Sequence, residues 1–247
     1  MQNMTSSPPS AWSTQPVAPL RPGLLLLVVG ARGGAGATTL AALLAAALAS
    51  RTATALVDLA GGPGLDVALG IETLPGPRWP DLAGAGDVPG DQVLAALPRW
   101  GQVAVVSADR ARPSLPPPRD VLDRLREAAG VVVLDVPTCD VLAGRAPVDR
   151  ADLVVVVAGR DVASVAGAVA LRTALGPLAA RAAVVASDAR RGPLGLAELE
   201  QATRLPLLGR VPYDRTVAQS AERGVVRARR ATTRVPDSLA GTVLGLR

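Results

Sequence analysis

Short apolar runs rich in valine and leucine alternate along the chain with longer stretches in which alanine and leucine recur at helical spacing. Runs of five or six apolar residues without polar alternation are typical of parallel strands covered on both faces. The predicted strands are 24–29, 53–58, 103–107, 131–135, 153–157 and 182–186. The predicted helices are 38–50, 92–97, 119–129, 162–175, 196–203, 216–223 and, on a weaker pattern, 238–246. This alternation predicts an α/β fold, with a doubly wound, mostly parallel sheet and helices on both faces.

The flanks differ from this central region in composition. Residues 1–22 are rich in Ser, Pro, Thr and Gln and carry no acidic residue, which predicts a disordered N-terminal tail. The α/β domain is expected at 23–224 and a basic extension with a short helix at 225–247. The apolar run 24–29 is ended by glycines, so it is too short to span a membrane, and the N-terminal segment does not have the pattern of a signal peptide.

Two segments rich in proline and glycine, 74–90 and 112–118, interrupt the alternation and predict surface loops. The first contains Arg78-Trp79-Pro80-Asp81. In a chain with 2% aromatic residues, Trp79 is expected to anchor its loop by packing. Contact with a partner is the alternative.

The residue types that are missing exclude several classes of chemistry. The chain contains no lysine and no histidine, so all 26 basic residues are arginine. Schiff-base lysines, histidine-based triads and histidine-bearing zinc sites are therefore excluded. Cys139 is the only cysteine, so no disulfide can form within one chain. A reducing, cytoplasmic setting is expected.

The basic excess lies at the C-terminal end. Residues 1–203 carry 17 arginines against 18 acidic residues, whereas residues 204–247 carry 9 against 3. Four arginines there are spaced four, three and four apart, and on a helix they would form one stripe for DNA phosphates, an anionic membrane or an acidic partner: Arg223, Arg227, Arg230 and Arg234. Gly224 and the Thr232-Thr233 pair are poor helix formers, which favours a solvated flexible run instead.

The last apolar residues are expected to dock on the core rather than to target a membrane. They are Leu239, Val243, Leu244 and Leu246. A membrane-targeting helix would be longer and flanked by more cations.

The turn between the first predicted strand and helix reads Gly30-Ala31-Arg32-Gly33-Gly34-Ala35-Gly36-Ala37-Thr38-Thr39. Glycines let the backbone curl so that successive N–H groups point inward, and the following helix adds its positive N-terminal end. Together these features predict a cradle for an anion. A tight strand-to-helix turn without a ligand is the alternative.

This turn resembles the deviant Walker A loop of the MinD/ParA family, whose pattern is Lys-Gly-Gly-x-Gly-Lys-Thr-Thr. The resemblance extends, in the right order, over residues 24 to about 224. Three further segments carry it: a switch I segment at 57–60 with 64–66 and 69–70, an Asp-x-Pro strand end at 133–137, and an adenine-side loop at 205–214. With Arg78-Trp79-Pro80-Asp81, the chain is most similar to the actinobacterial CpaE/TadZ-like branch, also called septum-site-determining proteins.

The resemblance implies ATP and Mg²⁺ as cofactors. It assigns nucleotide binding to Arg32, Gly33, Gly34, Ala35, Gly36, Ala37, Thr38, Thr39, Pro212 and Tyr213, and Mg²⁺ to Thr38, Asp58 and Asp135. The Arg32 guanidinium can also donate two hydrogen bonds to phosphate oxygens. The alternatives are that Asp58 and Asp135 only cap strand-to-helix junctions, and that Arg32 is a solvated loop charge.

Three departures from the family pattern change the expected chemistry. Ala37 stands in place of the phosphate-gripping lysine, Arg32 in place of the lysine that reaches across a dimer, and Ala60 in place of the carboxylate that positions water. Loss of a charge-assisted hydrogen bond weakens binding about ten- to a hundred-fold. Loss of transition-state stabilisation costs about 10² to 10³ in rate. We therefore expect a degenerate ATPase that binds ATP weakly and hardly hydrolyses it, with no catalytic residue.

The resemblance implies a scaffold that marks a position for Tad pilus or secretion assembly, or for cell division. Its partners would be proteins of that apparatus and a second copy of itself, and it would lie in the cytoplasm, at the pole or septum. The alternative is an active ParA-type ATPase that binds nucleoid DNA and uses Arg32 in place of the missing lysines. A dinucleotide-binding oxidoreductase is excluded by the glycine spacing and by the absence of catalytic His and Lys.

Overall fold

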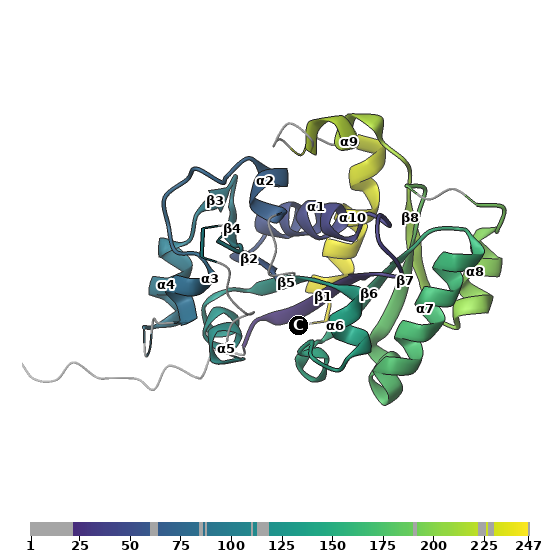
Figure 1. The fold of residues 1–247 in the computed structure, drawn as a ribbon, viewed down its shortest axis with the longest axis horizontal. Helices are drawn as coiled ribbons and strands as arrows, with labels where there is room; N and C mark the ends of the chain where they lie inside the picture. The colour runs from purple at the N-terminus through teal and green to yellow at the C-terminus, as the bar shows by residue number, and fades with distance from the viewer. Residues whose placement is uncertain are drawn as a thin grey trace, which may run out of the picture.

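An eight-stranded sheet lies between two layers of helices (Figure 1). The computed structural model describes residues 22–59, 64–83, 86, 88–109, 111–112, 119–189, 192–221, 226 and 230–246. The strand order is β3-β4-β2-β5-β1-β6-β7-β8, and every described pairing is parallel except that of β3 with β4. The predicted doubly wound α/β fold is confirmed.

All six predicted strands form, each within one residue of its predicted ends. The strands are β1 Leu24–Gly30, β2 Thr54–Asp58, β3 Arg99–Trp100, β4 Val103–Val106, β5 Val131–Val136, β6 Leu153–Ala158, β7 Ala182–Ser187 and β8 Leu207–Val211. The sequence did not predict β3 and β8, the two edge strands. They are short or only half-buried, and they include Arg99, Gly209 and Arg210, so they lack the continuous apolar run of a central strand.

The helices also follow the predicted order. They are α1 Ala37–Ala49, α2 Leu65–Leu69, α3 Trp79–Ala83, α4 Gly90–Ala96, α5 Arg119–Ala128, α6 Thr138–Leu142, α7 Val162–Leu175, α8 Leu196–Thr203, α9 Arg215–Ala221 and α10 Arg230–Leu244, with 3₁₀ turns η1 Val148–Arg150 and η2 Gly176–Arg181. The unpredicted α2, α3 and α6 have five residues each. One turn and a half is too short to show a helical period in the sequence.

Alternate residues of the central strands face opposite sides of the sheet and belong to two separate hydrophobic cores. Leu26 and Val28 of β1 face the layer that contains α1 and α10, whereas Leu25 and Leu27 face the layer that contains α5 and α7. Because both faces are covered, the central strands are mostly apolar on both faces, and their few polar residues lie near the strand ends. The same alternation places Asp58 and Asp135 on the face that α1 covers, since their strand neighbours Leu56 and Val133 belong to that core.

The C-terminal helix differs from its prediction. It begins at Arg230 rather than at residue 238, and it includes Thr232 and Thr233. The expected flexible run is therefore wrong for 230–234, which is helical, although Arg234 is exposed as expected. Tertiary contacts outweigh the low helix propensity of threonine, because Thr232 is 3% exposed. Of the arginine stripe, Arg230 and Arg234 lie on this helix, four residues apart, whereas Arg223 and Arg227 lie outside the described residues.

Docking of the C-terminal apolar residues is confirmed for three of the four. Leu239 and Val243 are buried against α1, and Leu244 packs on the same core. Leu246 is 52% exposed, so its predicted docking is wrong. Gly209 of β8 makes room for this helix, because a Cβ there would lie 3.1 Å from a methyl group of Val235. The predicted tail and Ala60 lie outside the described residues, as do residues 113–118 of the second predicted loop.

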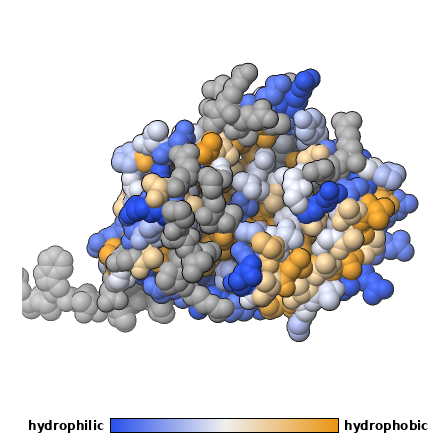
Figure 2. Space-filling model, in the orientation of Figure 1, coloured by the Kyte–Doolittle hydropathy of each residue, from blue (hydrophilic) through white to orange (hydrophobic). Residues whose placement is uncertain are grey.

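The α7 crossover is unusually apolar on its outer side. Val162–Arg181, which joins α7 and η2, has the length and composition to cross a membrane, with 22% of its most apolar window buried. It nevertheless connects β6 to β7 and covers one face of the sheet (Figure 1). Val162 and Leu142 are exposed there, and Figure 2 shows apolar surface over the region of α6 and α7.

Trp79 anchors its segment, as predicted, at the start of α3. The side chain is 1% exposed and its indole Nε1–H donates to the carbonyl oxygen of Asp58 at 2.6 Å. The neighbouring Arg78 guanidinium donates to the carbonyls of Ile71, Leu74 and Gly76. These bonds tie the 71–79 segment to the carboxyl end of β2.

Replacing Trp79 with phenylalanine removes the indole donor and leaves the buried Asp58 carbonyl without it. We expect Trp79→Phe to lower the free energy of unfolding by about 1–3 kcal/mol, measured by urea denaturation. Trp100→Phe, at the half-exposed edge strand, is the matched control and should cost less. Equal losses in the two variants would contradict the anchoring role.

Candidate functional site

The strand order of the sheet reverses beside β1, which makes the carboxyl end of this strand a topological switch point. From β1 the chain crosses to β2 on one side, whereas β6 lies on the other side. In open α/β sheets, ligands bind outside the carboxyl ends of the strands at such a reversal of strand order. The glycine-rich turn occupies this position, between Gly30 at the end of β1 and Ala37 at the start of α1.

The turn adopts the backbone that its glycines predicted. Gly34 and Gly36 have φ angles of 73° and 92°, in the left-handed region that favours glycine. Gly36 is the N-cap of α1, which has neither a side-chain cap nor an acidic residue in its first turn. The backbone N–H groups and positive end of this 13-residue helix therefore face the turn with no acidic residue of the helix's own first turn to neutralise them. This arrangement fits a phosphate group.

Two buried carboxylates and a hydroxyl lie beside the cradle. Asp58 of β2 and Asp135 of β5 are register partners on adjacent parallel strands, 2% and 7% exposed. The Thr38 hydroxyl in the first turn of α1 hydrogen-bonds to Asp135. Burial raises the pKa of Asp135 to about 6, and the Thr38 hydrogen bond opposes that shift. The structure thus brings Thr38 and Asp135 together at the cradle. Asp58 lies beside Asp135 on the adjacent strand but does not line the cavity along the turn.

Arg32 is held at the rim of the cradle. Its guanidinium Nη1 lies 3.2 Å from Oδ1 of Asp161, the N-cap residue of α7, which also accepts from the backbone and hydroxyl of Ser164. Together these partners lower the pKa of Asp161, with the Ser164 hydroxyl as the largest cause. Gly167 lets α7 approach this closely, because a Cβ there would meet the carbonyl oxygen of Ala31 at 2.0 Å. Arg32 is thus a partly solvated loop residue with an ion-pair partner, its side chain 39% exposed, and its role toward phosphate stays a prediction.

Two adjoining cavities share Gly36 and Thr39. The first, of about 340 Å³, follows the glycine-rich turn and ends at Asp135 and Pro137. It contains the predicted residues Arg32, Gly33, Gly34, Ala35, Gly36, Ala37, Thr38 and Thr39. The second, of about 110 Å³, lies between α1, β8 and the start of α10.

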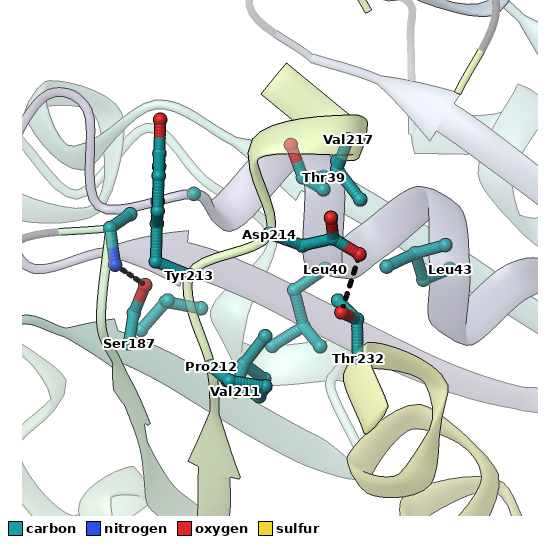
Figure 3. Close-up of a pocket in the computed structure, with 13 residues that line it drawn as sticks. Thr39, Leu40, Leu43, Ser187, Val211, Pro212, Tyr213, Asp214, Val217 and Thr232 are labelled. Carbon is teal, nitrogen blue, oxygen red and sulfur yellow. Dashed lines mark hydrogen bonds between the residues drawn. The ribbon is translucent and has the colours of Figure 1, made fainter. Parts of the chain in front are cut away.

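The second cavity is mainly apolar and contains the predicted Pro212 and Tyr213 (Figure 3). Asp214, at the end of the predicted adenine-side loop, also lines this cavity. The sequence reasoning missed other lining residues: Leu40, Leu43, Ser187, Val217 and Thr232. The apolar spacing of Leu40 and Leu43 identified a helix but not which face reached a cavity. Thr232 was missed because its segment was not expected to be helical.

The residues present fit a magnesium-bound nucleotide in part. The cradle and the apolar cavity meet at Gly36 and Thr39, which suits a ligand with phosphates at one end and a flat apolar ring at the other. Within the described residues, no group of three His, Cys, Asp or Glu side chains could hold a metal alone. Mg²⁺ commonly takes one or two protein ligands and completes its shell with water and substrate phosphates.

No protein-family model matches the sequence. The chain is 37% identical over 227 residues to uncharacterized proteins of two Mycobacterium tuberculosis strains. The match covers 91% of this chain and 64% of the length of those relatives, so the chain spans less than two thirds of each.

Solved structures with the same architecture cover nearly the whole chain. A ParA family ATPase from Chlorobium tepidum matches with a TM-score of 0.76 and 18% identity, over 89% of this chain and 98% of its own. MinD in the MinC:MinD cell division complex of Aquifex aeolicus matches at 0.72 and 20%, over 90% and 96%. MinD of Pyrococcus horikoshii with Mg-ADP matches at 0.68 and 17%, over 90% and 95%. The chain therefore has the P-loop NTPase fold of the MinD and ParA ATPases.

Proposed function

We propose that this chain binds Mg-ATP weakly, hydrolyses it hardly at all, and serves as a localisation scaffold of the MinD/ParA type. The main support for this proposal is a backbone cradle for phosphate that has no lysine at the position where the family pattern has one. The turn, the α1 N-terminus and the Thr38–Asp135 pair are in place, whereas Ala37 occupies the position of the phosphate-gripping lysine in the resembling pattern.

The missing lysine lowers both the affinity for ATP and the rate of hydrolysis. The size of each effect decides whether binding and turnover survive. Backbone N–H groups and the positive helix end supply part of the phosphate affinity without any side chain. Losing one charge-assisted hydrogen bond weakens binding by about ten- to a hundred-fold, which leaves binding measurable at high nucleotide concentration. Hydrolysis in this class of fold depends on electrostatic stabilisation and positioning of water, so the losses at Ala37 and Ala60 lower the rate further.

The scaffold role is supported by the resemblance and by what related folds do. One matching MinD was solved in complex with its partner MinC, and another with Mg-ADP. For this chain we propose protein partners in a Tad pilus, secretion or division apparatus, a homodimer, and a cytoplasmic place at the pole or septum. The CpaE/TadZ-like motifs are the support for that finer assignment, and the domain limits 23–224 and 225–247 remain predictions.

The alternative is an active ATPase that binds nucleoid DNA and uses Arg32 as its catalytic cation. The Arg32–Asp161 ion pair weighs against it, because Arg32 must leave that partner before it can reach a phosphate in the cradle. On the DNA side, Arg230 and Arg234 share a helix but the rest of the stripe is not described.

Steady-state phosphate release with saturating Mg-ATP separates the two functions. We expect no release above a protein-free blank, because Ala37 and Ala60 stand in place of the lysine and the carboxylate that the family pattern uses for turnover. Release that continues over many turnovers and disappears in Arg32→Ala would establish the alternative. Arg51→Ala, in the turn after α1 and away from the cradle, is the matched control.

Restoring a lysine at the cradle tests the origin of the weak binding. Ala37→Lys should tighten Mg-ATP binding about ten- to a hundred-fold, because it restores a charge-assisted hydrogen bond to phosphate. Equilibrium titration with a fluorescent ATP analogue measures the change. Ala46→Lys, on the exposed part of α1, adds the same charge elsewhere and should have little effect. If the two variants bind alike, the cradle is not the phosphate site.

Asp135 links Mg²⁺ binding to pH-dependent stability. Its pKa of about 6 lies above the ordinary 3.8, so its ionisation destabilises the ligand-free fold as pH rises from about 4 to 6, and the loss stays constant above that range. Asp135→Asn should therefore raise the free energy of unfolding by about 1–3 kcal/mol at pH 7.5 and much less at pH 4. The same variant should lose the Mg²⁺-dependent part of ATP affinity. A variant less stable than wild type at pH 7.5, with unchanged Mg²⁺ dependence, would contradict this role.

A further inference from the structure

The last helix contributes to the wall of the apolar cavity. Thr232, in the first turn of α10, lines this cavity together with Thr39 of α1 and Asp214 of the loop after β8. Residues from three distant segments of the chain thus surround the same space (Figure 3). A ligand that fills it would contact α10 directly.

Asp214 joins the two C-terminal helices through its carboxylate. Oδ1 accepts from the backbone N–H of Thr216 in α9 at 2.8 Å, and Oδ2 accepts from the Thr232 hydroxyl in α10 at 2.8 Å. Thr232 is buried, and a hydrogen bond to a charged acceptor is stronger than one between neutral groups. This bond fixes the first turn of α10 to the loop that forms the cavity.

The first turn of α10 is weakly connected to the rest of its own helix. Pro236 lies inside the helix and has no N–H to donate to the carbonyl of Thr232, four residues earlier. Beyond the proline, Leu239, Ala240 and Val243 are fully buried against the α1 side of the sheet. The distal part of α10 is therefore held by apolar packing, and the first turn depends more on the Thr232–Asp214 bond.

We propose that ligand binding in this cavity and docking of the first turn of α10 are thermodynamically coupled, with Thr232 as the positioning residue. The inference rests on the proposed nucleotide function, because it takes the purine end of Mg-ATP as the occupant. A nucleotide that contacts the wall only when the turn is docked stabilises the docked state. By linkage, the factor by which bound nucleotide favours docking equals the factor by which docking tightens nucleotide binding, so undocking the turn weakens nucleotide binding.

Hydrogen–deuterium exchange of the backbone amides, with Mg-ATP as the probe, measures this coupling. In the wild-type chain, saturating Mg-ATP should slow exchange in residues 231–235 about five-fold or more, and should change residues 239–244 less. Thr232→Val removes the hydroxyl. It should speed exchange in the first turn without nucleotide and weaken Mg-ATP binding about five-fold or more.

Two further variants exclude a merely local effect. Thr232→Ser keeps the hydroxyl and should restore both exchange and binding. Thr242→Val removes an exposed hydroxyl from the same helix and should match the wild-type chain in both. Exchange in residues 41–45 of α1 reports whether each variant is folded.

The outcomes separate this coupling from the proposed function. If Mg-ATP binds the wild-type chain and Thr232→Val alike, and leaves exchange in residues 231–235 unchanged, the coupling is wrong and nucleotide binding stands. If Thr232→Val is unfolded, failure of Thr232→Ser to bind like the wild type overturns the coupling. If the wild-type chain binds no Mg-ATP at the concentrations that saturate Ala37→Lys, the proposed function is wrong and the coupling fails with it.

Discussion

The positive N-terminal end of α1 faces a glycine-rich turn that contains no acidic residue. The other residues of the site surround this positive helix end. The turn can take this shape because Gly34 and Gly36 adopt left-handed backbone angles. On one side Thr38 engages the buried carboxylate of Asp135. On the other side Arg32 is drawn to the N-cap of α7. A phosphate group would complete the arrangement, since the backbone alone offers it hydrogen bonds and a favourable field.

The proposed function requires a site that binds nucleotide without the lysine of the family pattern. The cradle is made of backbone, and its shape depends on glycines and on the packing of α1, neither of which needs the lysine. Ionised Asp135 lowers the stability of the ligand-free fold, because burial raises its pKa to about 6. In the proposed scaffold, bound Mg²⁺ would offset the charge of the Asp135 carboxylate, and phosphates would offset the positive end of α1.

The sequence predicted the central sheet and the cradle because each depends on local pattern. Continuous apolar runs such as 131–134 indicate buried strands, and glycines between a strand and a helix indicate a tight turn. The missed features depend on contacts between distant residues. The Arg32–Asp161 pair joins positions 129 residues apart, and no local signal identifies it. Thr232 lies in a helix that its own propensity opposes, because burial against Asp214 outweighs that propensity. Strand β8 is half-buried at the sheet edge, so its apolar pattern is incomplete.

The central claim is that nucleotide binds here without being consumed. The direct measurement is to incubate the chain with Mg-ATP above its dissociation constant, remove free nucleotide by rapid filtration, denature the protein and identify what was bound by chromatography. We expect the recovered nucleotide to be intact ATP both after a minute and after an hour. Conversion of the bound fraction to ADP within minutes, faster than in a protein-free control, would contradict it.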